Sequence, residues 1–171
     1  SIEPELAGEL RKSLGIDDIS LEINYLGNPI SRERYINDLK NYLIPKIDKF
    51  CGDCFRRVES NVLRVLDCKN SSCNIELVGA PSILDYLLGS EIDSFNKIKA
   101  GLNLIEVPFN INDRLVRGLD YYTNLVFEIK CNNLNLGTIL AGGRYNNLIK
   151  EIGNKDMPAV GFAAGIERMI E

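Results

Sequence analysis

The chain contains no histidine, and this absence restricts the chemistry that it can perform. Histidine is the commonest general base and the commonest metal ligand in proteins. Any catalysis must therefore rest on arginine, tyrosine, carboxylates, backbone amides or an added metal ion.

Long apolar runs are also missing. No segment approaches the roughly 20 apolar residues that a membrane-spanning helix needs, and the acidic opening at residues 1–5 lacks the basic start of a signal peptide. We therefore expect a cytoplasmic protein with no membrane contact. The five cysteines are an odd number in a chain without an export signal, which indicates reduced thiols rather than a disulfide framework.

Basic charge is not in excess, because 20 lysines and arginines face 24 acidic residues and give a net charge of -4. Affinity for nucleic-acid backbones depends on the basic side chains brought to the phosphates. The balance argues against a general nucleic-acid coat and leaves room for a local basic patch. The 171 residues, of which 45% are hydrophobic, suffice for one core with an inserted subdomain.

Hydrophobic spacing predicts a succession of helices and strands. We expect a strand over 20–24, then a helix with Ser31 as its N-cap that bends or ends at Pro45. Further helices are expected over 4–14, 82–88, 91–102 and 148–152, and further strands over 104–107, 125–130 and 137–141. A small-residue strand from Pro158 should lead into a helix whose first turn holds Arg168.

Four of the cysteines lie in the helical segment. They form Cys51-Gly-Asp-Cys54 and, thirteen residues later, Cys68-Lys-Asn-Ser-Ser-Cys73. Two close pairs are typical of a structural zinc site, whereas the four-residue gap in the second pair, the lack of histidine and the tendency of cysteine to fill cores favour packed thiols. The sequence leaves zinc open but does not favour it. The neighbouring basic residues suit either a polynucleotide backbone or a solvated surface: Arg56, Arg57, Arg64 and Lys69.

The densest polar cluster is the stretch 116–123, which contains Arg117, Asp120, Tyr121 and Tyr122 just before an expected strand. Arginine presents a planar fork to a carboxylate or phosphate, and tyrosines give a pocket apolar walls with hydroxyl tips. The stretch could therefore bind an anion, but taken alone it favours a buried Arg–Asp pair beside core tyrosines.

A second cluster ends the next expected strand, where Gly142 and Gly143 precede Arg144 and Tyr145. Adjacent strands would bring the two clusters together, and glycines would let the backbone approach a ligand closely. Arg168 would add positive charge at a helix N-terminus, where free amides favour anions, unless it is an ordinary surface arginine.

Three segments together resemble the histidyl-tRNA synthetases, a family of class II aminoacyl-tRNA synthetases. Arg-Gly-Leu-Asp-Tyr-Tyr-Thr at 117–123 and Ala-Gly-Gly-Arg-Tyr at 141–145 are similar to the family's two histidine-specific signatures. Pro-Ala-Val-Gly-Phe-Ala-Ala-Gly-Ile-Glu-Arg at 158–168 resembles class II motif 3, and segments 21–27 and 61–67 extend the resemblance over most of the chain.

The resemblance implies an α+β fold, with a mixed, largely antiparallel catalytic sheet flanked by helices. Residues 1–28 and 105–171 would belong to this core, and residues 29–104 would form a helical insertion that approaches the tRNA acceptor arm. The implied substrates are histidine, ATP with Mg²⁺, and tRNA(His), in a full-length protein that is a homodimer.

The resemblance also implies residue roles, with no metal ligand among them. Arg117 would contact the substrate carboxylate and the α-phosphate, and Arg168 would contact ATP. The histidine pocket would be lined by Tyr121, Tyr122 and Tyr145, of which the last two would face the imidazole, and by the backbone of Gly142 and Gly143.

The family's motifs 1 and 2 do not occur after Ser1, no anticodon-binding domain precedes Glu171, and the chain stops within an expected helix. We therefore expect part of a longer protein that does not aminoacylate by itself. Asn146 replaces a usual aspartate and Asn124 a frequent glycine. The alternatives are a non-catalytic paralogue that regulates ATP phosphoribosyltransferase, and a tRNA-binding or zinc-binding module built on the insertion. The retained arginines and tyrosines favour the enzyme, and the sequence upstream of Ser1 would decide.

Overall fold

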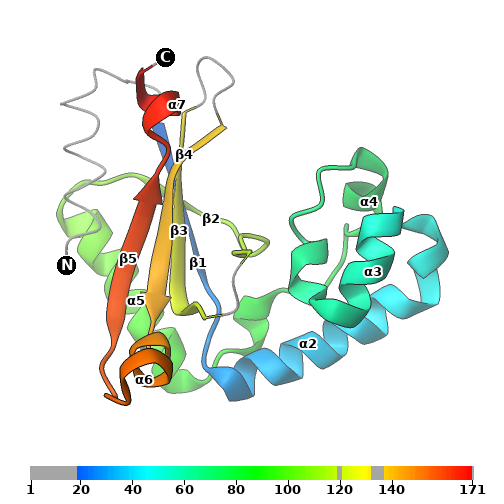
Figure 1. Cartoon of the computed structure of the whole chain (residues 1–171), viewed down its shortest axis with the longest axis horizontal. Coiled ribbons are helices and arrows are strands. Elements are labelled where there is room, and N and C mark those ends of the chain that lie inside the picture. Colours follow the sequence, from blue (N-terminus) through cyan, green and yellow to red (C-terminus); the bar gives the residue numbers. More distant parts are fainter. Residues whose placement is uncertain (1–18, 119–120, 132–136, 171) are drawn as a thin grey trace.

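The computed structural model describes residues 19–118, 121–131 and 137–170, and its centre is a five-stranded sheet (Figure 1). The strand order is β2-β1-β3-β4-β5, with β1 and β2 parallel and every other neighbouring pair antiparallel. The expected mixed, largely antiparallel sheet is therefore confirmed. The strands are β1 (Ile19–Tyr25), β2 (Phe109–Ile111), β3 (Thr123–Cys131), β4 (Gly137–Tyr145) and β5 (Ala159–Ala164).

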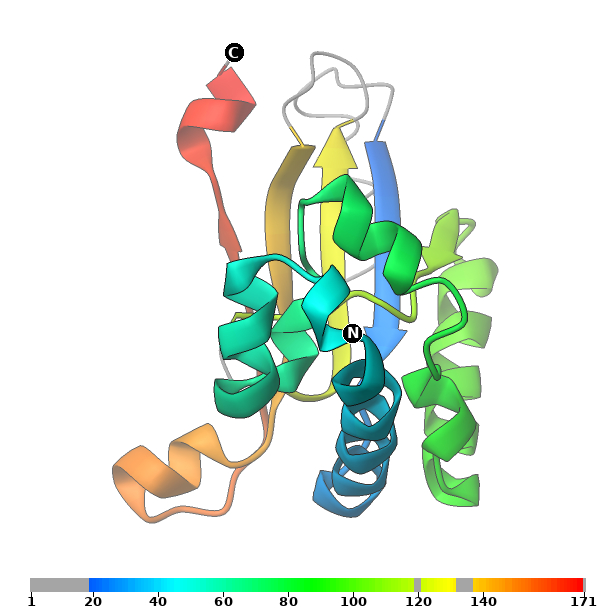
Figure 2. The same ribbon diagram turned by 90° about the vertical axis from the view of Figure 1, so that its right-hand side faces the viewer.

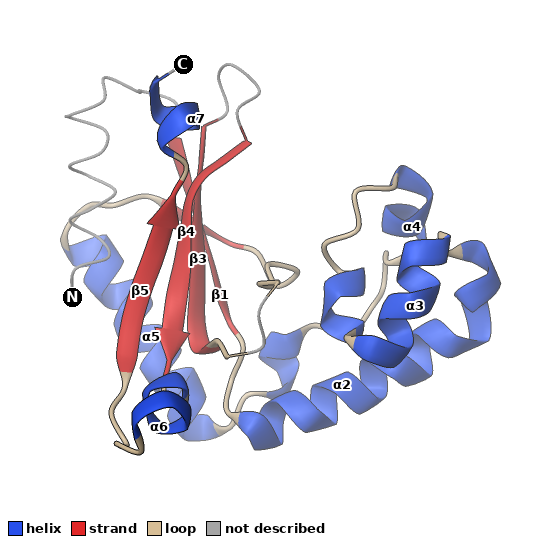
Figure 3. Cartoon of the chain, in the orientation of Figure 1, coloured by secondary structure: helices blue, strands red, loops and turns tan. Residues whose placement is uncertain are grey.

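Most of the helical structure lies between β1 and β2 in the sequence. Helices α2, α3 and α4 gather in a block to one side of the sheet, while α5 runs alongside the strands (Figures 1 and 3). Turned by 90°, the molecule shows α2 and α5 as separate columns (Figure 2). The helices are α2 (Pro29–Leu43), α3 (Gly52–Ser60), α4 (Ser71–Glu76), α5 (Gly89–Leu104), α6 (Leu148–Gly153) and α7 (Ile166–Ile170), with 3-10 turns at Ile44–Lys49, Val62–Val65 and Ile83–Tyr86.

Two hydrophobic clusters support the sheet. One packs α5 against the strands through Phe95 and Leu102. The other fills the helical block, where Tyr35, Leu39 and Leu43 of α2 recur at helical spacing and are buried, and it continues to Val126 of β3 and to the segment before that strand. The helical block is thus packed against the sheet at the point where the site residues begin.

Helix α2 begins at Pro29, three residues earlier than expected. Asn28, not Ser31, is its N-cap, because the Asn28 Oδ1 accepts hydrogen bonds from the backbone of Ile30 and Ser31, and proline suits the first helical position. Ser31 is buried and its hydroxyl donates to Glu91 at 2.5 Å. The predicted end near Pro45 is confirmed, since α2 stops at Leu43.

The carboxylate of Glu91 joins the start of α2 to the start of α5. Besides the Ser31 hydroxyl, it accepts from the backbone N–H of Asn28 (2.5 Å) and of Leu88 (2.7 Å). Burial alone would raise the pKa of Glu91, but these three hydrogen bonds favour the charged form and hold its pKa below the usual 4.5.

The prediction of a strand over 104–107 is wrong, because α5 continues through Leu104 and the strand forms after Pro108, at Phe109–Ile111. Glu106 adopts a left-handed φ of 58°, and the N–H of Val107 donates to Leu102 at 3.0 Å, which closes the helix end. The helix expected over 82–88 is only a 3-10 turn, and the one expected over 4–14 lies outside the described residues.

Candidate functional site

Arg117 lies on the segment that connects β2 to β3. Leu115 and Val116 just before it are buried, and the fully buried Asn24 of β1 donates its side-chain N–H groups to the carbonyls of Asp113 (3.1 Å) and Leu115 (2.9 Å). Satisfied hydrogen bonds of a buried amide fix a loop in place. The backbone beside Arg117 is therefore anchored to the central part of the sheet.

The acidic partner of Arg117 is Glu128 of β3, with Nη1 and Oε1 separated by 2.5 Å. The two side chains are only 24% and 14% exposed, so water screens this pair less than a surface pair. The arginine Nε is buried and makes no hydrogen bond to the described residues. Asp120, the partner considered from sequence, lies outside the described residues.

Glu128 also links Arg117 to Arg168. Its second oxygen accepts from the Thr138 hydroxyl at 3.0 Å, and the Thr138 carbonyl accepts from Arg168 Nη1 at 2.6 Å. Arg168 is exposed in the first turn of α7, as its predicted position requires. Arg117 and Arg168, which belong to the first and the third of the sequence motifs, are therefore linked through Glu128 of β3 and Thr138 of β4.

Glu128 and Thr138 were not singled out from the sequence. The sequence signal for Glu128 was the alternation of apolar and polar residues in β3. This alternation correctly predicted that Leu125, Phe127 and Ile129 are buried and that Glu128 shares the other face with Lys130. Lys130 forms an ion pair with Glu22 of β1 at 2.7 Å, and Asn112 donates to the same carboxylate at 2.6 Å. This face of the sheet is consequently charged.

Tyr121, Tyr122 and Tyr145 form one aromatic cluster. Their ring centroids lie 4.4 to 6.0 Å apart, and the hydroxyls of Tyr121 and Tyr122 are 3.3 Å apart. Arg32 of α2 supports the cluster by donating to the Tyr122 carbonyl at 2.6 Å. The three tyrosines that the sequence placed in one pocket thus come together between β3, β4 and α2.

The Tyr122 hydroxyl is a neutral donor at physiological pH. Burial raises its pKa to about 12, Tyr121 adds to this shift, and the nearby Arg117 guanidinium opposes it. The same guanidinium is paired with Glu128, so the tyrosine cluster lies near the arginine–glutamate pair.

The glycines of β4 make room for aromatic rings. A Cβ on Gly143 would lie 2.8 Å from the Tyr122 ring, and a Cβ on Gly142 would lie 2.8 Å from the Phe127 ring and collide with the Gly161 carbonyl. A Cβ on Gly161 of β5, which the sequence reasoning missed, would collide with the Tyr145 hydroxyl. The space beside each glycine is thus filled by this chain's own atoms.

Both asparagines at positions where the family has another residue are accommodated. Asn124 has a left-handed φ of 56° at a bulge between β3 and β4, a conformation in which glycine and asparagine are the favoured residues. Asn146 Oδ1 accepts from Arg144 Nε at 2.8 Å, as a carboxylate oxygen would. Asn146 N also donates to the Thr123 hydroxyl at 3.1 Å.

Two cavities adjoin the site. One of about 320 Å³ lies between the helical block and the sheet and is lined by residues from both, among them Lys69, Asn74, Arg114 and Lys130. Arg114 spans the two parts by donating to the Leu77 carbonyl at 2.9 Å. The other, of about 260 Å³, lies beside Tyr121 and the start of α2.

The four clustered cysteines do come together in the helical block. Their sulfur atoms all lie within 4.8 Å of one another, and none is in a disulfide. Of the basic residues nearby, Arg56 pairs with Asp53 and Lys69 with Asp67, so part of the charge expected for a polynucleotide is already matched.

Comparison with known proteins identifies the relatives of this chain. A family model described as histidyl-tRNA synthetase matches residues 62–169. The histidine–tRNA ligase of Halothermothrix orenii is 46% identical over 163 residues, which are 95% of this chain and 39% of that protein. The apo histidyl-tRNA synthetase of S. aureus is 31% identical with a TM-score of 0.71, and the match covers 99% of this chain and 42% of that one.

A structure from Bacillus halodurans described as an ATP phosphoribosyltransferase regulatory subunit/histidyl-tRNA synthetase has a TM-score of 0.60 at 18% identity, which shows the fold alone. The mixed sheet flanked by helices is that of the class II aminoacyl-tRNA synthetases. Within that class, the chain belongs to the histidyl-tRNA synthetase family, because the family model matches more than half of it. It spans about two fifths of the length of these relatives. No helix among the described residues has the length and apolar character to cross a membrane.

Proposed function

We propose that this chain is part of the catalytic domain of a histidine–tRNA ligase, together with its helical insertion. The whole protein would activate histidine with ATP and transfer the histidyl group to tRNA(His). The observation that carries the proposal is the cluster of Tyr121, Tyr122 and Tyr145, whose ring centroids lie 4.4 to 6.0 Å apart, in a chain of this family that is 46% identical to a histidine–tRNA ligase.

Activation needs orientation and charge stabilisation more than it needs a protein nucleophile. The histidine carboxylate attacks the α-phosphorus of ATP, the bond to the bridging oxygen breaks, and pyrophosphate leaves with Mg²⁺ bound to its oxygens. Arg117 would contact both the carboxylate and the α-phosphate and stabilise the negative charge that builds up there. Its pair with Glu128 holds the guanidinium in one orientation. The absence of histidine from the chain is compatible with this chemistry.

Tyr121, Tyr122 and Tyr145 would form the histidine pocket. The raised pKa of Tyr122 keeps its hydroxyl protonated, so it can donate a hydrogen bond to an imidazole nitrogen. Tyr145 would pack against the imidazole from β4, where Gly161 leaves room for its hydroxyl. Gly142 and Gly143 would line the pocket with their backbone, and Gly143 leaves room for the Tyr122 ring beside the strand.

Arg168 would bind the phosphates of ATP. Its guanidinium is exposed and uses Nη1 for the Thr138 carbonyl, which leaves its other donors for an anion. Residues 1–28 and 105–171 would belong to the catalytic core, and residues 29–104 would approach the tRNA acceptor arm. A homodimer in the cytoplasm is the assembly and location that we propose for the whole protein.

The test uses the full-length protein in ATP–pyrophosphate exchange with each of the twenty amino acids, followed by tRNA charging. We expect exchange with histidine alone and charging of tRNA(His). A folded full-length protein that exchanges no pyrophosphate, but stimulates an ATP phosphoribosyltransferase, would instead establish the regulatory paralogue.

A further inference from the structure

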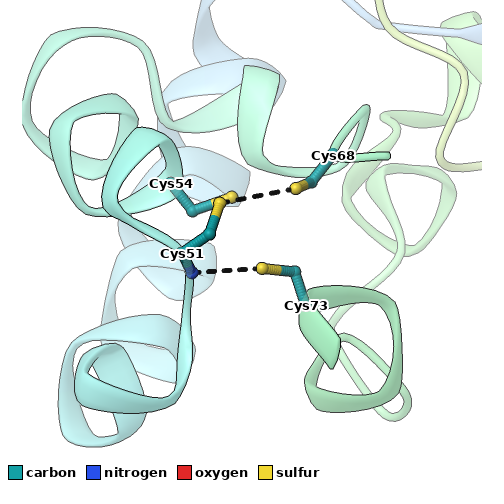
Figure 4. A group of neighbouring side chains, drawn as sticks. All are labelled: Cys51, Cys54, Cys68 and Cys73. Atoms are coloured by element: carbon teal, nitrogen blue, oxygen red, sulfur yellow. Dashed lines mark hydrogen bonds between the residues drawn. The ribbon is translucent and has the colours of Figure 1, made fainter. Parts of the chain in front are cut away.

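Cys51, Cys54, Cys68 and Cys73 converge on one point of the helical block (Figure 4). Cys51 directly precedes α3, and Cys54 lies in its first turn. Cys68 follows the second 3-10 turn, and Cys73 lies in α4. Three of the four are buried, and Cys51 is partly exposed. The four cysteines therefore bring together three short segments of the helical block: the start of α3, the segment that holds Cys68, and α4.

The spacing of the sulfur atoms suits a single ion. Four thiolates around one tetrahedral Zn²⁺, each about 2.3 Å from the metal, lie about 3.8 Å from one another. The Cys51 and Cys68 sulfurs are 3.8 Å apart, and all four sulfurs lie within 4.8 Å. An iron–sulfur cluster places several iron and sulfide ions between its cysteines, so it holds their sulfurs farther apart than this.

Backbone amides support two of the sulfurs. The N–H of Cys51 donates to the Cys73 sulfur at 3.2 Å, and the N–H of Asn70 donates to the Cys68 sulfur at 3.5 Å. Such hydrogen bonds stabilise the negative charge of thiolate ligands and fix their directions, as outer partners do at metal sites generally. Thiols that merely filled a core would not require amide donors.

The four-residue gap between Cys68 and Cys73, which counted against zinc in the sequence, has a structural reason. Asn70 is the N-cap of α4, and its side chain accepts from the N–H of Ser72. The additional residues start this helix, so that Cys73 faces back toward Cys68 from the first turn. Both cysteine pairs thus end in the first turn of a helix, and the longer gap preserves the convergence.

We propose that Cys51, Cys54, Cys68 and Cys73 bind one structural Zn²⁺. Four protein ligands close a tetrahedral site and leave no position for water or substrate, which distinguishes a structural from a catalytic zinc. The ion would fasten α3, α4 and the Cys68 segment, and through Arg114 and Leu77 it would hold the wall of the cavity between the helical block and the sheet.

The first experiment measures metal content in the full-length protein, purified without chelator, by inductively coupled plasma mass spectrometry. We expect about one zinc per chain, and loss of most of it in Cys68→Ser and Cys73→Ser. The matched control is Cys131→Ala, which removes the fifth cysteine, buried in β3 and outside the cluster. This variant should retain its zinc.

A second measurement does not depend on how the variants fold. Zinc is removed from the wild-type protein by a chelator, and Co²⁺ is added in its place. We expect the visible absorption of tetrahedral cobalt with four thiolates, displaced by Zn²⁺ with an apparent Kd of about 50 nM or tighter, the range of structural zinc sites. Hydrogen exchange of amides in residues 51–77 should quicken on zinc removal, while exchange in β3 should not change.

Less than a tenth of a zinc per chain, with no cobalt spectrum on reconstitution, would overturn the site. One iron per chain in place of zinc would overturn the choice of metal. Either result would leave the ligase proposal intact, since pyrophosphate exchange is measured separately.

Discussion

The arginine–tyrosine site and the cysteine cluster are assembled by different means. Arg117, Glu128, Thr138 and Arg168 lie on four successive segments of the chain and meet because β3 and β4 pair side by side. The four cysteines lie within residues 51–73 and meet through short helices. The arginine–tyrosine site thus depends on the pairing of the strands, and the cysteine cluster depends on contacts within one short stretch of the chain.

This difference determines how firmly the polypeptide alone fixes the side chains of each site. The sheet supplies continuous backbone hydrogen bonds that fix its side chains without a ligand. Segments as short as α4 have little stability by themselves, because a helix of few residues repays little of its nucleation cost. The proposed zinc ion would therefore take the place of regular structure in the helical block, whereas the strands hold the sheet face in place by themselves.

The largest effect that we expect on the sheet side is from Arg117→Ala in the full-length protein. The change removes the cation that we propose stabilises the charge at the α-phosphate, and it leaves Glu128 without its arginine partner. Histidine-dependent pyrophosphate exchange should fall by about 100-fold or more. The control is Arg56→Ala, an exposed arginine of α3, which should leave exchange within two-fold. Exchange by the Arg117 variant within a few-fold of wild type would refute its assigned role.

Glu91 connects α2 of the helical block to α5 beside the sheet, and we expect Glu91→Gln to lower the stability of the fold. The glutamine side chain has one acceptor oxygen in place of two, while the same three groups donate to it. The free energy of unfolding at pH 7 should therefore fall by about 1–3 kcal/mol in denaturant titrations. Because the folded state lowers the pKa of Glu91, its contribution is complete above the unfolded value near 4.5 and is lost as pH falls through the folded value. The difference between variant and wild type should therefore shrink below pH 4.5.

Glu33→Gln, at an exposed position of α2, serves as the control and should change little at any pH. If the Glu91→Gln difference stayed constant through the acid range, the carboxylate charge would not be the source of the stabilisation.

The sequence predicted the sheet strands and the grouping of site residues better than it predicted the partners of those residues. Alternation placed Glu128 on the polar face of β3, but only the β3–β4 register brings Thr138 beside it. Likewise, periodicity could not reveal that Glu91 caps two helices, because Asn28 is 63 residues away. Long-range pairing of polar groups depends on the packed fold, whereas local periodicity depends on neighbours in the chain.

On the histidine side of the sheet site we expect a smaller effect from Tyr122→Phe. Loss of the hydroxyl that we propose donates to the imidazole should raise the KM for histidine by about 5-fold, the equivalent of one ordinary hydrogen bond. Tyr86→Phe removes a hydroxyl of the helical block that donates to Asp38 at 2.7 Å and should leave this KM unchanged. Equal KM values for both variants and wild type would place the imidazole elsewhere.

The smallest effect concerns the bulge that aligns the sheet site. Asn124 has a φ of 56°, so Asn124→Gly should keep the free energy of unfolding within about 0.5 kcal/mol of wild type. Asn124→Val should cost about 1–2 kcal/mol, since a β-branched residue is strained in the left-handed region. At the exposed Asn110 of β2, which has no such φ, the same change to valine should be neutral. Equal denaturant midpoints for the two Asn124 variants would mean that the bulge relaxes, and the β3 register would then not depend on this residue.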